Sequence, residues 1–167
     1  TKLKSLNNLI EIFDTLIIGG AMANTFLLAQ GFNMGKSIVE KHLIVDAKQI
    51  IEKSNHFKHN LILPVDLVCS NGIEDITNIQ FVDVKNILPN QMALDIGYNT
   101  IKLIQLFMLK SNLILWNGPL GVFENKPFDN GTNQVAEIIK KNAQKLNIMT
   151  FAGGGDTVAA IKNTKAE

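Results

Sequence analysis

Arginine is absent from this 167-residue chain, whose 16 basic residues are all lysines. The planar guanidinium of arginine is the side chain best suited to grip a carboxylate or a phosphate through two parallel hydrogen bonds. An anion bound by this chain must therefore be held by backbone N–H groups, by lysines and by a metal ion.

Cysteine and long hydrophobic runs are also scarce. Cys69 is the only cysteine, which excludes an internal disulfide, favours the reducing cytoplasm and suits a small core residue. The apolar runs are far too short to span a bilayer and no signal-peptide pattern is present, so no membrane partner is expected. A net charge of +1 gives no reason to expect a nucleic-acid partner.

Length and composition favour one globular domain. With 46% hydrophobic and 19% charged residues, the chain can bury a sizeable core. The chain opens with Thr1 directly in a helical pattern, and we interpret it as a piece of a longer protein.

Helical stripes alternate with short apolar runs along the chain, which is the rhythm of a parallel sheet with crossover helices. Apolar spacings of three and four predict helices over residues 2–13, 21–30, 41–53, 99–109 and 134–145. Short apolar or β-branched runs predict strands over residues 15–18, 61–63, 66–70, 81–84, 112–116 and 148–152, with 81–84 in an antiparallel piece. Residues 90–97 stay unassigned, and Met92 and Leu94 there suit either the core or a pocket wall. The predicted fold class is α/β, a Rossmann-like three-layer α/β/α arrangement with a mostly parallel sheet.

The most informative stretch is IMTFAGGGDTVAAI, residues 148–161. A strand that stops at three glycines and leads at once into a helix leaves unpaired N–H groups at its tip, where the helix dipole also favours an anion. Asp156 is placed either to cap this helix or to hold a divalent cation, and Thr157 either to cap it or to bond a phosphate. The alternative is a tight turn with an Asp cap and no ligand.

Two further strands end in loops that contain glycine. Residues 15–18 run into Gly19 and Gly20, and residues 112–116 run into the loop 117–124. The carboxyl ends of parallel strands lie at one edge of a sheet, so we expect the three loops to form one crevice for a flat heterocycle and its phosphates. The lone Gly19-Gly20 pair is equally explained by close packing of a helix on a strand.

Four segments together resemble phosphoglycerate kinase. They are WNGPLGVFE at 116–124, GGGDT at 153–157, IIGGAMANTFLLAQGFNMGKS at 17–37 and LILPVD at 61–66. The likeness covers essentially all 167 residues and is to the nucleotide-binding C-terminal domain of that family, here incomplete at both ends. It implies a cytoplasmic glycolytic enzyme that transfers phosphate between 1,3-bisphosphoglycerate with ADP and 3-phosphoglycerate with MgATP.

The resemblance implies an adenine and ribose end of the site. Gly19 and Gly20 are expected against one face of adenine and Met92 and Leu94 against the other. The remaining residues implied for this end are Pro119 and Gly121 at the pocket floor and Glu124, which accepts from the ribose hydroxyls. Ala21 and Ala93 stand where the family often has glycine, which is expected to narrow the adenine slot.

A phosphate end is implied as well. Residues expected to meet phosphate are Lys2, Asn117, Gly153, Gly154, Gly155 and Thr157. Asp156 is expected to hold the Mg²⁺ that accompanies ATP or ADP.

The family's phosphoglycerate-binding N-terminal domain, with its arginine cluster, is not within these residues, and a further glycine-rich stretch is expected beyond Glu167. The resemblance thus implies that the isolated chain binds MgADP or MgATP weakly without turnover, and that the full-length enzyme is a monomer. A non-catalytic nucleotide-binding module or a structural remnant is the main alternative. An unrelated dinucleotide-dependent oxidoreductase is disfavoured because no G-x-G-x-x-G fingerprint is present.

Overall fold

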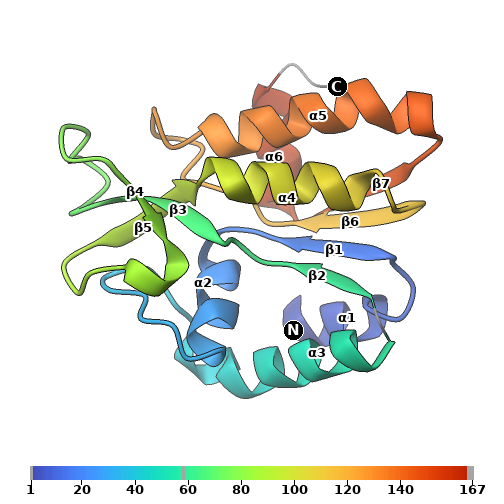
Figure 1. Ribbon diagram of the computed structural model, residues 1–167, viewed down its shortest axis with the longest axis horizontal. Helices are drawn as coiled ribbons and strands as arrows, with labels where there is room; N and C mark the ends of the chain where they lie inside the picture. The colour runs from blue at the N-terminus through green and yellow to red at the C-terminus, as the bar shows by residue number, and fades with distance from the viewer. Residues whose placement is uncertain (1, 58, 165–167) are drawn as a thin grey trace.

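The computed structural model describes residues 2–57 and 59–164 (Figure 1). Its larger sheet has four parallel strands in the order β2–β1–β6–β7. Their bounds are Thr15–Ile18 for β1, Asn60–Ile62 for β2, Leu113–Asn117 for β6 and Met149–Gly153 for β7. The parallel sheet predicted from the apolar runs is therefore confirmed, with each strand displaced by no more than one residue.

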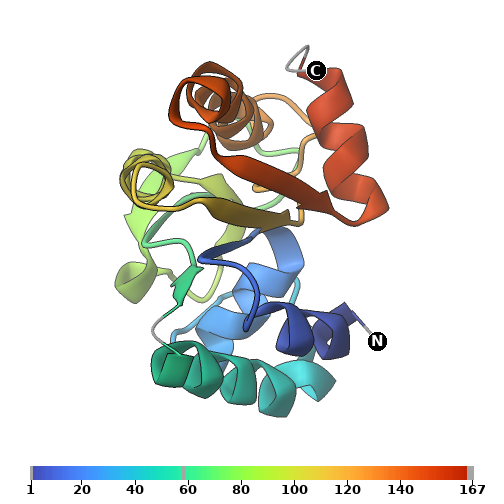
Figure 2. The ribbon, with the colours of Figure 1, turned by 90° about the vertical axis from the view of Figure 1, so that its right-hand side faces the viewer.

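Helices cover both faces of this sheet (Figure 2). On one side lie α1 (Lys2–Leu9), α2 (Gly20–Ala29) and α3 (Ile44–Phe57), the last preceded by a short 3₁₀ turn, Lys41–Leu43. On the other side lie α4 (Tyr98–Met108) and α5 (Asn130–Leu146). This is the predicted three-layer α/β/α arrangement. The last helix, α6 (Gly155–Asn163), packs beside β7 and α5.

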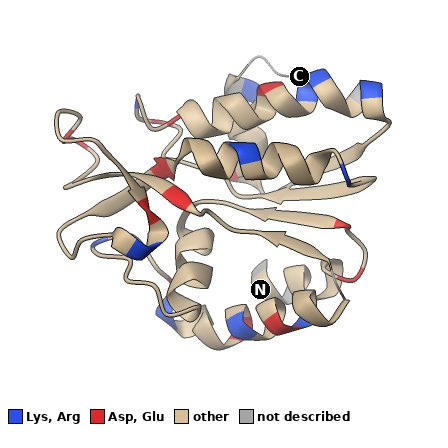
Figure 3. Cartoon of the chain, in the orientation of Figure 1, with Lys and Arg blue, Asp and Glu red and all other residues tan. Residues whose placement is uncertain are grey.

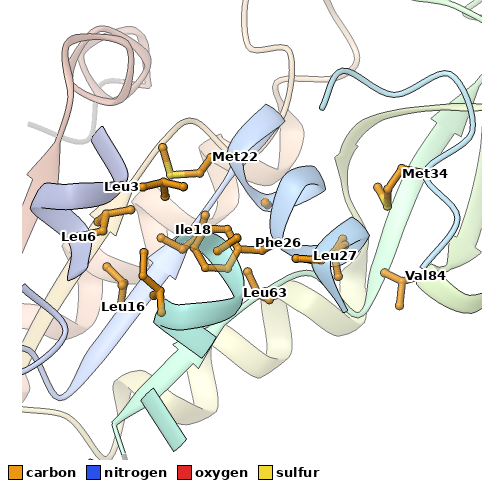
Figure 4. Packing of buried hydrophobic residues seen from close by; sticks show 14 of the residues in the cluster. Leu3, Leu6, Leu16, Ile18, Met22, Phe26, Leu27, Met34, Leu63 and Val84 are labelled. Atoms are coloured by element: carbon orange, nitrogen blue, oxygen red, sulfur yellow. The ribbon is translucent and has the colours of Figure 1, made fainter. Parts of the chain in front are cut away.

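Side chains of β1 alternate between two hydrophobic clusters, as the period-two geometry of a strand requires. Leu16 and Ile18 point into the cluster that holds Phe26 of α2 (Figure 4). Ile17 points to the opposite face, where it shares a cluster with Trp116 of β6. The two central strands, β1 and β6, are thus buried on both faces, which explains why they read as continuous apolar runs. The edge strand β7 stays largely exposed.

A second sheet of three antiparallel strands extends from one end of the first (Figure 1). The central strand β3 (Asp66–Ser70) lies between β4 (Gln80–Asp83) and β5 (Met92–Ile96). The antiparallel prediction is confirmed, and the unassigned stretch 90–97 contributes β5. Cys69 is fully buried in β3 as expected, and burial raises the pKa of its thiol to about 11.

Three helices differ from their predicted bounds by more than one residue. Helix α3 runs from Ile44 to Phe57 in place of the predicted 41–53, because residues 41–43 form the 3₁₀ turn. The first helix was expected to reach Phe13 but ends at Leu9, because the chain turns there to enter β1. Phe13 nevertheless stays buried, and the Asp14 carboxylate accepts hydrogen bonds from the N–H groups of Asn112 and Leu113, which fastens this turn to the start of β6. Helix α5 begins at Asn130, four residues before the predicted start at 134.

Charged residues are absent from the strands of the larger sheet (Figure 3). Its four strands contain no lysine, aspartate or glutamate, and the lysines within residues 2–57 and 59–164 lie on helices and loops. Within the described ranges, no helix has both the length and the apolar character needed to cross a bilayer.

Candidate functional site

The carboxyl ends of β1, β6 and β7 meet at one edge of the larger sheet. In the strand register Ile18 lies opposite Asn117, and Asn117 lies opposite Gly153. The Gly19 N–H donates to the Asn117 carbonyl at 2.9 Å, which carries the pairing past the last residue of β1. The three glycine-containing loops therefore come together, as predicted.

Gly19 is required by packing. A Cβ at this position would lie 2.5 Å from the Pro119 carbonyl oxygen and 2.7 Å from that of Gly118, well inside van der Waals contact. The loops after β1 and β6 cross at this point. The packing explanation considered for the Gly19-Gly20 pair therefore holds for Gly19, whether or not a ligand also lies against it.

Two cavities open beside these loops. The first, here called the apolar cavity, has a volume of about 380 Å³ and runs between β5, α2 and the loop 119–124. The second, here called the glycine cavity, has a volume of about 530 Å³ and runs between α1, the start of α2 and the loop 153–157. Both cavities are lined by Gly20, Ala21, Ile38, Pro119 and Asp156, so they lie side by side and are together called the groove here.

Most of the predicted site residues line this groove. Those on the apolar cavity are Gly20, Met92, Leu94, Pro119, Gly121, Glu124 and Asp156. Those on the glycine cavity are Gly19, Gly20, Asn117, Pro119, Gly153, Gly154, Asp156 and Thr157. Gly155 lines neither cavity, and the side chain of Lys2 lies outside what the structure describes.

Two helices begin at the glycine cavity without a side-chain cap. Helix α2 follows Gly19 and helix α6 follows Gly154, and neither of these residues can offer a side-chain acceptor to the first turn. Gly154 has φ +90°, a left-handed conformation that favours glycine. Uncapped N–H groups and two helix dipoles directed at one cavity favour an anion there.

The Thr157 side chain is buried and its hydroxyl is already bonded. Its Oγ1 donates to the Gly153 carbonyl at 2.6 Å and accepts from the Gly118 N–H at 2.8 Å. The hydroxyl proton is therefore not available for the expected bond to a phosphate in this arrangement. Thr157 instead joins the loop after β6 to the loop after β7, and its contribution to an anion site is its backbone N–H.

Asn117 faces the glycine cavity from the end of β6. Its Nδ2 lies 3.4 Å from the Met22 sulfur, which is a weak acceptor. An anionic oxygen in the cavity offers this amide a stronger hydrogen bond.

Asp156 is exposed in the first turn of α6 and lines both cavities. Among the residues that the structure describes, no cluster of three or more His, Cys, Asp and Glu side chains is arranged to hold a metal ion. A Mg²⁺ ion at Asp156 would thus take most of its ligands from phosphate oxygens and water, which is how Mg²⁺ is usually bound beside nucleotides.

Sequence reasoning missed Asn24 and Asp95, which both line the apolar cavity. Asn24 Nδ2 donates to the Ile38 carbonyl at 3.2 Å and so holds one wall of the groove. Asp95 is 2% exposed, and burial raises the pKa of its carboxyl to about 7. The signal that could have identified Asp95 is a charged residue inside the otherwise apolar segment MALDIG.

A sequence model described as phosphoglycerate kinase matches residues 1–167, the whole chain. This chain belongs to the phosphoglycerate kinase family. Curated phosphoglycerate kinases from Desulforapulum autotrophicum and Bartonella bacilliformis are 43% and 44% identical to it over 161 and 163 residues. These matches cover 96% and 98% of the chain but only 40% and 41% of the relatives, so the chain spans about two fifths of their length.

Solved structures of family members agree with this fold. Phosphoglycerate kinase from Coxiella burnetii superposes with a TM-score of 0.89 at 34% identity, over 99% of this chain and 41% of that one. The enzyme from Pyrococcus horikoshii gives a TM-score of 0.73 at 29% identity, over 96% of this chain and 40% of that one.

Proposed function

We propose that this chain is the nucleotide-binding part of a phosphoglycerate kinase and that MgADP and MgATP bind in the groove formed by the two cavities. The observation that carries this proposal is the division of the groove. Its apolar cavity suits a flat heterocycle, and its glycine cavity has two uncapped helix N-termini suited to phosphates.

The nucleotide would lie along the groove with its base in the apolar cavity. Adenine would pack against Met92 and Leu94 of β5, with Gly20 opposite. Glu124, at the end of the loop after β6, lines the same cavity and would accept hydrogen bonds from the ribose hydroxyls. Both kinds of contact are the same before and during reaction, so they contribute to affinity more than to the rate of the chemical step.

The phosphates would lie in the glycine cavity. The backbone N–H groups at the starts of α2 and α6 and the amide of Asn117 would hold them, and Asp156 would hold Mg²⁺ against their outer oxygens. When bound, this Mg²⁺ neutralises charge on the phosphate being transferred.

The full reaction needs groups that these residues do not supply. No lysine side chain that the structure describes lines either cavity, and the sequence has no arginine to grip an acidic substrate. We propose that 3-phosphoglycerate or 1,3-bisphosphoglycerate is bound by an N-terminal domain outside these residues, in a cytoplasmic, monomeric enzyme. In-line phosphoryl transfer requires both substrates to be aligned, so this chain alone is expected to bind nucleotide without turnover.

Calorimetric titration of ADP with and without Mg²⁺ tests the proposal. Asp156→Ala should weaken MgADP binding by about tenfold and leave metal-free ADP binding nearly unchanged, because only the metal contact is lost. Asp46→Ala is the matched control, since Asp46 is also an acid in the first turn of a helix but lines neither cavity. Equal losses with and without Mg²⁺ would exclude the metal role of Asp156, and an unmodified chain that binds no nucleotide would refute the proposed function.

A further inference from the structure

Asp95 connects strand β5 to the start of helix α5. Its Oδ1 accepts from the Ile96 N–H at 2.8 Å and its Oδ2 accepts from the Gly131 N–H at 2.7 Å. Gly131 is the second residue of α5, so the carboxyl satisfies an N–H group that would otherwise have no partner within the helix. The acceptor comes from a different element, 36 residues away in sequence.

The same carboxyl is in contact with the loop that lines the apolar cavity. A Cβ added at Gly121 or at Gly131 would collide with Asp95 Oδ1. Glycine at both positions therefore lets the loop and the helix close on one buried carboxyl. Asp95 lies where β5, the loop after β6 and α5 meet, and it lines the apolar cavity itself.

Two further hydrogen bonds fasten the loop after β6 to strand β5 on one side and to helix α5 on the other. The Val122 N–H donates to the Leu94 carbonyl of β5 at 2.8 Å. The Leu120 N–H donates to Thr132 Oγ1 of α5 at 3.0 Å. A shift of α5 relative to β5 would therefore move the segment 120–122, which forms one wall of the apolar cavity.

We propose that Asp95 is a positioning residue for nucleotide binding, which holds α5 on β5 and thereby sets the position of the cavity wall around Gly121. This inference rests on the proposed function, since it takes the apolar cavity to be the site of the base. Asp95 acts through the loop and the helix, because both of its oxygens accept hydrogen bonds from backbone N–H groups.

The chain contains a matched arrangement whose acid and threonine do not line the groove. Asp66 of β3 accepts from the N–H groups of Asn99 and Thr100 and so caps helix α4, as Asp95 caps α5. Thr100 Oγ1 accepts from the Val65 N–H, as Thr132 Oγ1 accepts from Leu120. Neither Asp66 nor Thr100 lines the apolar or the glycine cavity.

The test compares Asp95→Asn with Asp66→Asn in the full-length protein. The dissociation constant for MgADP is measured by calorimetry and the melting temperature by circular dichroism. Both variants lose a cap of the same kind, so both should melt at lower temperature. Only Asp95→Asn should weaken MgADP binding, by about tenfold, while Asp66→Asn should stay within about twofold of the unmodified protein.

An unchanged MgADP affinity in Asp95→Asn, or an equal loss in both variants, would overturn the inference while leaving the proposed function intact. An unmodified protein that does not bind MgADP would overturn both. If Asp95→Asn does not fold, Thr132→Val and Thr100→Val decide the question by the same criterion. Thr132→Val should weaken MgADP binding severalfold and Thr100→Val should not.

Discussion

Asp95 is also a titrating group whose charge costs stability. Burial raises the pKa of its carboxyl to about 7, and the charge of neighbouring Asp129 adds to the rise. Hydrogen bonds from the N–H groups of Gly131 and Ile96 act in the opposite direction and lower the pKa. In the unfolded chain the pKa returns to its ordinary value of 3.8, so the folded state binds the proton more tightly. The contribution of Asp95 to the free energy of unfolding is therefore largest below about pH 4 and is lost as the pH rises through about 7.

We therefore expect the free energy of unfolding to fall by up to about 4 kcal/mol between those pH values through Asp95 alone. Urea unfolding of the unmodified protein and of Asp95→Asn at pH 4.5 and pH 8 measures this contribution as the difference between their pH slopes. Identical slopes in the two proteins would show that Asp95 does not titrate in this range.

Thr157 illustrates a residue whose role depends on a distant partner. Thr157→Val removes the bonds to Gly153 and Gly118 and leaves the Gly118 N–H without its acceptor, so we expect a loss of about 1–3 kcal/mol in unfolding free energy. Thr157→Ser keeps the hydroxyl and should stay within about 1 kcal/mol of the original. Denaturant unfolding distinguishes the two, and equal losses would mean that the methyl group matters more than the hydroxyl.

For Thr157 the sequence predicted where the residue lies but not which groups its side chain bonds, and for Asp95 it predicted neither. Thr157 lies at the predicted loop, but its hydroxyl bonds a backbone group 39 residues away, which no local pattern reveals. Asp95 was not singled out because residues 90–97 show no clean alternation. The strand β5 is half-buried at Met92 and Ala93 and fully buried from Leu94 to Ile96, so its burial does not alternate either.

Among the elements, the loops after β1 and β6 pass each other with no space for a side chain. Gly19→Ala would place a methyl group 2.5 Å from the Pro119 carbonyl oxygen, and the backbone at that crossing must move to admit it. We expect a loss of about 1–3 kcal/mol in unfolding free energy, typical of overpacking. Gly72→Ala is the control, because a Cβ there meets nothing within 4 Å and should change stability little. Similar behaviour of the two variants would contradict the described crossing.

Helices α1 and α3 are joined by a lysine. Lys53 Nζ donates to the Asn7 carbonyl in α1 at 2.6 Å and lies 2.6 Å from Glu11 Oε1. Lys53→Met should lower the free energy of unfolding by about 1 kcal/mol, because a charged donor at the last turn of α1 is lost. Lys141→Met is the control, since the Lys141–Glu137 pair is exposed with its atoms 4.0 Å apart and should contribute almost nothing. Thermal unfolding of the two variants measures the difference, and equal melting temperatures would contradict the role of Lys53.

Element type was predictable wherever one kind of pattern dominated, as in the apolar runs of the buried strands β1 and β6. The ends of the helices and strands were harder to predict, because they depend on groups elsewhere in the chain. The start of α5 at Asn130 coincides with the Asp95 carboxyl that accepts from Gly131, and the turn before β1 is held by Asp14 against β6. Both anchors join residues far apart in sequence.

For the whole molecule, family membership, fold and groove agree. The chain belongs to the phosphoglycerate kinase family, its parallel sheet brings three strand ends together, and the groove of two adjacent cavities lies beside them. The chain spans about two fifths of its curated relatives, so the groove is proposed to supply nucleotide to a reaction completed by residues outside this chain.

The most direct test is a crystal structure of the protein with MgADP. We predict adenine against Met92 and Leu94 in the apolar cavity, the terminal phosphate at the N-terminus of α6 and Mg²⁺ at Asp156. Nucleotide bound elsewhere, or bound in the groove with its phosphates against β5, would contradict this prediction.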